Sequence, residues 1–181
     1  MRAVPATRAL CVAVLGLAFA IGAAAQAPRT YSLKFNHVLG PKEPYHAGFE
    51  KWAKRVEERT RGGLKIEVFH SAQLGKEEDI IEQMRQGANL GQNTDSARMG
   101  NYVPAMAVMN GPYFVETLEE VAKLRNAPSV KRWQEELATK HGLRVVCFNW
   151  VQGYRHFFTN KPVRKPEDLR GQRVRTPPAP I

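Results

Sequence analysis

Two kinds of apolar spacing alternate along most of this chain. In residues 31–35 and 64–68 every second side chain is apolar, which is typical of a strand with one buried face. The apolar residues within 45–56 and 80–84 instead recur at helical spacing. A further short strand is expected within Asn89–Asp95. Strands that alternate with helices predict an α/β fold with a largely parallel sheet and helices on both of its faces.

Start and stop signals continue this pattern in the second half of the chain. Thr117 and Glu120 are spaced as a capping box, T-x-x-E, which predicts the first turn of a short helix. Ser129 is expected to cap another helix, which ends at Gly142. The continuous apolar run 143–148 predicts a buried strand.

The first 25 residues have the organisation of an exported leader. Arg2 and Arg8 precede the apolar run Ala9–Ile21, which is too short to span a bilayer. Ala23–Ala25 offers an A-x-A cleavage site. We therefore predict a signal peptide over residues 1–25 and a periplasmic protein that does not itself span the membrane; the alternative is a buried N-terminal helix.

Charge and reactive side chains exclude several classes of function. The net charge is +10, but the basic residues are interleaved with acids, as in Lys54–Glu58, which is typical of solvated helix faces. No basic tract carries interleaved aromatics, so we do not expect a nucleic-acid partner. The five histidines lack metal-ligand spacing, and Ser71 lacks the glycines of a nucleophile elbow. Cys147 is predicted to be a small buried side chain, and we expect no metal, cofactor or catalysis.

Polar side chains follow the predicted strands. In parallel α/β sheets, ligands bind beyond the carboxyl ends of the strands. Those ends carry His37, His70–Ser71, Thr94–Asp95 and Asn149–Trp150. His37 is a candidate to line a cleft, and the alternative is a loop histidine that makes an ordinary hydrogen bond.

Six motifs, in this order, make the chain resemble a known family. They are Leu33–Phe35, Ser71–Gly75, Asp95–Arg98, Pro112–Phe114, Gly153–Arg155 and Pro166–Arg175. On these motifs the chain resembles the DctP-type solute-binding subunits of tripartite ATP-independent periplasmic (TRAP) transporters. The resemblance implies a two-domain flytrap fold that captures a small organic acid and delivers it to a membrane permease.

Family members are longer than this chain. The resemblance therefore implies that residues 26–150 form most of a first α/β domain. Residues 151–181 are then a hinge strand and the start of a second domain, most of which is missing.

The same resemblance assigns roles to individual residues. Arg175 matches the arginine that pairs with the ligand carboxylate, and Arg155 matches a second pocket arginine. Asp95 and Phe114 fall at or near further pocket positions, and Trp150 is expected to cover the apolar part of the solute.

The chemistry of arginine supports the carboxylate role but does not select the position. A planar guanidinium offers two parallel donors that fit a carboxylate. On a strand, however, Arg173 and Arg175 share one face, so the residues alone leave both open, together with a surface role. The alternative function is a secreted α/β hydrolase that acts on an acidic substrate.

Overall fold

Three parallel strands form the central sheet of the protein. The structure is a computed structural model that describes residues 29–148, 151, 153, 156–176 and 178. The strands are β1 (Tyr31–Asn36), β2 (Leu64–Phe69) and β3 (Leu90–Gln92), in the order β2-β1-β3. In this register Phe35 of β1 lies between Val68 of β2 and Gly91 of β3. The predicted α/β fold with a parallel sheet is confirmed.

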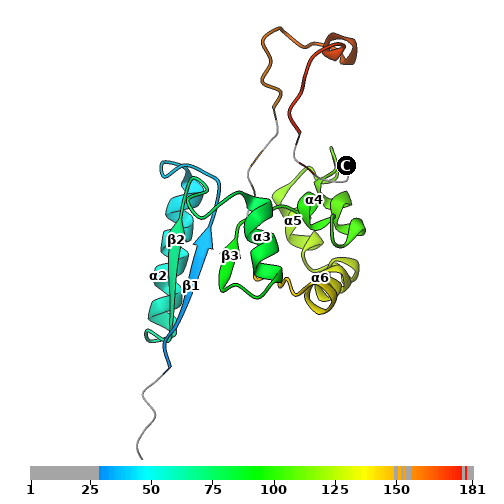
Figure 1. Cartoon of the computed structure of the whole chain (residues 1–181). Helices are drawn as coiled ribbons and strands as arrows, with labels where there is room; N and C mark the ends of the chain where they lie inside the picture. The colour runs from blue at the N-terminus through cyan, green and yellow to red at the C-terminus, as the bar shows by residue number, and fades with distance from the viewer. Residues whose placement is uncertain (1–28, 149–150, 152, 154–155, 177, 179–181) are drawn as a thin grey trace, which may run out of the picture.

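Two helices connect these strands. α2 (Pro44–Arg59) joins β1 to β2, and α3 (Glu77–Arg85) joins β2 to β3. The first connection moves to one edge of the sheet and the second returns across β1 to the other edge. Because crossovers between parallel strands are right-handed, steps in opposite directions place α2 and α3 on opposite faces. Figure 1 shows the strands between these two helices.

The face of α2 that meets the sheet has the helical spacing seen in the sequence. Pro44 occupies the first turn, where its missing N–H costs nothing. Phe49 and Ala53, one turn apart, are buried. The rings of Phe49 and Trp52 pack on Phe35 of β1, with centroid separations of 4.9 and 5.2 Å.

Four further helices follow β3 and surround a second part of the core. They are α4 (Ser96–Met99), the 3-10 helix η1 (Pro104–Asn110), α5 (Leu118–Leu124) and α6 (Pro128–His141). Their buried cluster includes Ile81, Met99, Val103, Met106, Met109, Val130, Leu137 and Leu143. Gly100 permits the close approach of α4 and η1, because a Cβ at this position would lie 2.7 Å from the Cβ of Ala107.

The helix signals were mostly right. Thr117 and Glu120 form the complete capping box at the start of α5. Gly142 ends α6 in the left-handed conformation, with φ 70°, which glycine adopts without strain. Ser129 is not the cap of α6, which was an error. The N-cap is Ala127, because proline at position 128 has the φ of a first helical residue and starts the helix two residues earlier.

The predicted strand over residues 143–148 is wrong. No described residue pairs with this segment as a strand. Leu143 is buried, whereas Val146 is 82% exposed and Cys147 is exposed, contrary to the prediction for this cysteine. An apolar run becomes a strand only where a second backbone offers a hydrogen-bonding ladder.

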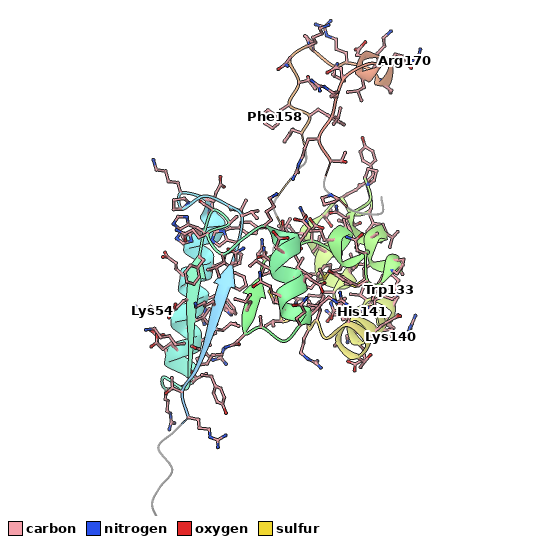
Figure 2. The ribbon with its side chains drawn as sticks, viewed as in Figure 1. Lys54, Trp133, Lys140, His141, Phe158 and Arg170 are labelled. Atoms are coloured by element: carbon pink, nitrogen blue, oxygen red, sulfur yellow. The ribbon has the colours of Figure 1, made fainter. Side chains whose placement is uncertain are left out.

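Residues 156–176 form an arm that leaves the body and returns to it (Figure 1). After Pro166 the arm forms a single 3-10 turn, η2 (Pro166–Leu169). Arg173–Arg175 has no strand partner among the described residues, so the strand considered for these arginines is not formed. Figure 2 shows Phe158 and Arg170 on this arm, away from the packed helices. No helix in the described part of the chain is long and apolar enough to cross a bilayer.

Candidate functional site

The carboxyl ends of β1 and β3 lie side by side, and the buried side chain of Asn36 joins them. Its Nδ2 donates to Gln92 Oε1 at 2.8 Å and to the carbonyl of Gly75 at 3.3 Å. Its Oδ1 accepts from the backbone N–H of Leu74 at 3.3 Å. One amide therefore links the central strand, its neighbour and the loop that leads to α3.

A guanidinium surrounded by three carboxylates lies at this edge of the sheet. Arg98 Nε donates to Glu78 Oε1 at 2.8 Å, and its Nη1 donates to Asp95 Oδ2 at 2.5 Å. Its Nη2 lies 3.3 Å from Glu77 Oε2. We call these four residues the Arg98 cluster.

Local structure explains how the Arg98 cluster assembles. Asp95 follows β3 and caps α4, because its Oδ1 accepts from the backbone N–H of Arg98 at 2.9 Å. Glu77 and Glu78 lie in the first turn of α3, where the helix dipole favours negative charge. The loop after β2 and the loop after β3 therefore bring their charged residues together.

The carboxylates of the Arg98 cluster titrate differently. Burial raises the pKa of Glu77, and the charge of Arg98 opposes this shift. The hydrogen bond from Arg98 lowers the pKa of Glu78, and the more distant charge of Arg175 adds to that lowering. Arg175 is exposed on the arm, and no contact between it and Glu78 is seen among the described residues. Glu78 is thus ionised at neutral pH and bonded to the guanidinium of Arg98.

Three histidines form a second group at the ends of β1 and β2. His37 is completely buried, and its Nε2 lies 3.1 Å from His46 Nδ1. The Nε2 of His46 lies 3.4 Å from Glu50 Oε1, and its ring lies 5.1 Å from the ring of His70. Burial, followed by the charges of His46 and His70, lowers the pKa of His37 to about 4. The described residues contain no histidine, cysteine and carboxylate group arranged to hold a metal ion.

This buried histidine is expected to make the fold sensitive to acid. In the unfolded chain a histidine takes up its proton near pH 6.5, whereas folded His37 does so only near pH 4. Since the unfolded state binds more protons between these values, lowering the pH favours unfolding, by about 3 kcal/mol in total from pH 7 to pH 4. Above about pH 6.5 the contribution is fully present.

Urea unfolding of the His37→Phe protein between pH 7 and pH 4 measures this contribution. Between pH 7 and pH 4, the free energy of unfolding of this variant should fall by about 3 kcal/mol less than that of the parent protein. His156→Asn, at an exposed position of the arm, is the control. Its free energy of unfolding should fall with pH as much as that of the parent protein. An unchanged decline in His37→Phe would contradict the assignment.

The structure places some of the predicted site residues and not others. Asp95 lies in the Arg98 cluster. His37 lies in the loop directly after β1, completely buried and within hydrogen-bonding distance of His46, which agrees with the alternative of a hydrogen-bonded loop histidine. Phe114 is partly exposed and lines a shallow cavity over α5, apart from the Arg98 cluster. Trp150 and Arg155 lie outside the described residues.

Arg98 is the residue that sequence reasoning missed. It lies three positions after Asp95, a spacing that brings two side chains onto one face of a helix. That spacing was available in the motif Asp95–Arg98, but it does not show that Glu77 and Glu78 also reach the guanidinium.

Comparison with known proteins places the chain in a family. The model of the bacterial extracellular solute-binding proteins of family 7 (DctP) matches residues 35–181. A solute-binding protein of Chromohalobacter salexigens is 32% identical over 137 residues, which are 75% of this chain and 40% of the relative. The C4-dicarboxylate-binding periplasmic protein DctP of Rhodobacter capsulatus is 28% identical over 144 residues, covering 79% of this chain and 43% of that protein.

A solved structure shows the same relationship. A TRAP periplasmic solute-binding protein from Ochrobacterium anthropi, with bound L-fuconate, superposes with a TM-score of 0.78 at 31% identity. The match covers 83% of this chain and 50% of that one. The chain thus spans half or less of the length of these relatives. All of them are solute-binding proteins rather than enzymes, as expected, and the chain belongs to the DctP family of bacterial extracellular solute-binding proteins.

Proposed function

We propose that the protein captures a small organic acid in the periplasm and delivers it to the permease of a TRAP transporter. The observation that supports the proposal is the Arg98 cluster at the carboxyl edge of a parallel sheet, where the charge of the exposed Arg175 also acts on Glu78. In open parallel α/β sheets, ligands bind beyond this edge. The relatives are named for acids, L-fuconate in one case and C4-dicarboxylates in another.

In this proposal Arg175 pairs with the carboxylate of the ligand. Its side chain is exposed, and its charge acts at a distance on the carboxylate of Glu78. A ligand carboxylate would replace part of that interaction with two parallel, charge-assisted hydrogen bonds. Arg155 would assist, and Phe114 and Trp150 would cover the apolar part of the solute.

Capture requires the two parts of a flytrap to close on the ligand. Residues 26–150 would form the first domain, and residues 151–181 the hinge and the start of the second. The ligand stabilises the closed arrangement only by contacts that it makes better there than in the open one. Arg175 on the arm and the Arg98 cluster on the sheet domain would together supply such contacts.

The exchange Arg175→Met tests the carboxylate role. It removes both guanidinium hydrogen bonds while keeping a long apolar side chain, so we expect the affinity for the ligand acid to fall roughly 10- to 100-fold. Isothermal titration calorimetry on the whole protein measures the change, after a thermal-shift screen of organic acids has identified a ligand that is bound and not consumed.

Arg173→Met is the matched control. Arg173 is also exposed and lies on the same extended segment, but the proposal gives it no contact with the carboxylate. Its affinity should stay within about twofold of the parent. Parental affinity in Arg175→Met, or an equal loss in both variants, would remove the proposed role of Arg175.

A further inference from the structure

Two loops at the carboxyl end of the sheet are fastened to each other by backbone hydrogen bonds. We call them the β1–α2 loop and the β2–α3 loop, after the elements that they connect. The amide of Ser71 donates to the carbonyl of Leu39 at 2.8 Å, and the amide of Ala72 donates to the carbonyl of His37 at 3.0 Å. These two bonds hold the loops side by side.

The β2–α3 loop is strained at the residues that make these bonds. Ser71 and Ala72 both have the left-handed backbone conformation, with φ of 51° and 57°. Neither residue is a glycine, so in each of them the Cβ lies too close to a backbone carbonyl oxygen. A strained conformation of this kind persists only while the contacts around it outweigh its cost.

The ring of His37 is buried at the same junction. Its Nε2 lies 3.1 Å from Nδ1 of His46, whose own Nε2 lies 3.4 Å from a carboxylate oxygen of Glu50. The negative carboxylate favours the tautomer of His46 that carries its hydrogen on Nε2. His46 then offers the lone pair of Nδ1 to a hydrogen on Nε2 of His37. The nitrogen of His37 that remains to take up a proton is therefore Nδ1.

The surroundings of this Nδ1 do not suit a protonated ring. Nδ1 of His37 is buried and has no hydrogen-bond partner among the described residues, so an N–H there would be unsatisfied. His46 from α2 and His70 from the end of β2 act on the ring and repel a positive charge. Lys42 and Glu43, on the same loop, are exposed. A charged His37 is therefore stable only when its ring reaches water.

We propose that this junction opens in acid: when His37 takes up a proton, the β1–α2 and β2–α3 loops separate while the rest of the fold stays folded. The bonds from Ser71 and Ala72 break, and release of their left-handed strain favours the open form. Asn36 stays bonded to Leu74 and Gly75, which limits the opening to the first part of the β2–α3 loop. No ligand is needed for this opening.

Hydrogen exchange of single amides, followed by NMR on the full chain, tests the proposal. The pKa of His37 is about 4 in the closed form and about 6.5 once the ring is exposed. The open form thus binds more protons between these values, and acid favours it. The protection factors of the Ser71 and Ala72 amides should fall roughly 10- to 20-fold from pH 7 to pH 5.

The dependence on urea distinguishes this local opening from global unfolding. A local opening exposes little surface, so exchange at Ser71 and Ala72 should not change in urea below the unfolding transition. The amide of Leu137, in the buried face of α6, should exchange more slowly at both pH values and accelerate with urea.

Three variants separate the titration of His37 from the strain of the loop. His37→Phe keeps a buried ring without a titratable nitrogen, so the fall between pH 7 and pH 5 should disappear. His156→Asn removes an exposed histidine of the arm and should keep the parental fall. Ala72→Gly relieves the left-handed strain, so protection of the amides at 71 and 72 should rise roughly threefold at both pH values.

Two results would overturn the proposal. The first is protection at Ser71 and Ala72 that does not fall in acid, or that falls equally in His37→Phe. The second is exchange at these amides with the same urea dependence as at Leu137, since the loops would then separate only on global unfolding. If His37→Phe does not fold, the urea dependence of the parent protein and the rise in Ala72→Gly decide.

Discussion

Replacing Arg98 with methionine is expected to lower the free energy of unfolding by about 3–5 kcal/mol. The guanidinium is nearly buried and bonds to carboxylates from the start of α3 and from the cap of α4. Methionine fills much of the same space but leaves Glu77 buried without a cation. Urea unfolding at pH 7 measures the loss, and activity is not needed as a readout.

Two further variants distinguish the buried cluster from an ordinary ion pair. Lys140→Met breaks the exposed pair with Glu136 and should cost less than about 1 kcal/mol. Adding Glu77→Gln to Arg98→Met should recover part of the loss, because the side chain left without its partner is then neutral. A loss in Arg98→Met no larger than that in Lys140→Met would contradict the structural role.

Truncating Phe49 to alanine should also cost about 3–5 kcal/mol. The ring is 1% exposed and lies between the sheet and α2, within 5.1 Å of the His37 ring and 4.9 Å of the Phe35 ring, centroid to centroid. Backbone elements on both sides hold the cavity open, since neither the strand nor the helix can collapse into it. Chemical unfolding of Phe49→Ala at pH 7 measures the cost.

Val146→Ala is the control for that truncation. This side chain is largely exposed on the extended segment after α6, so its removal should change the stability by no more than about 0.5 kcal/mol. A loss below about 1 kcal/mol in Phe49→Ala would mean that the ring does not anchor α2 to the sheet.

Local patterns were sufficient to predict the first half of the fold. Alternating apolar residues in β1 and β2, and a helical stripe through Phe49 and Ala53, are properties of short segments, and the structure confirms both. Residues 143–148 show the limit of this approach. A strand needs a neighbouring strand to pair with. The apolar run of residues 143–148 contains no information about whether such a partner is present.

The candidate site was predictable to a similar extent. Strand ends pointed to Asp95, and the resemblance pointed to Arg175, whose role stays a prediction. The helix dipole explains why Glu77 and Glu78 are tolerated at the start of α3, but it does not predict that they meet Arg98. That meeting depends on how the ends of β2 and β3 are spaced across β1, which is a property of the whole sheet.

The side chain of Asn36 makes the carboxyl ends of β1 and β3 rigid, which matters for any ligand that binds beside them. Its amide uses both of its hydrogens and its oxygen within the protein, so the ends of β1 and β3 cannot slide or separate without breaking buried bonds. These strand ends are thus preorganised, and little of their conformational entropy would be lost if a ligand bound beside them. In the proposed capture of a solute, any rearrangement would therefore occur in parts of the protein other than these two strand ends.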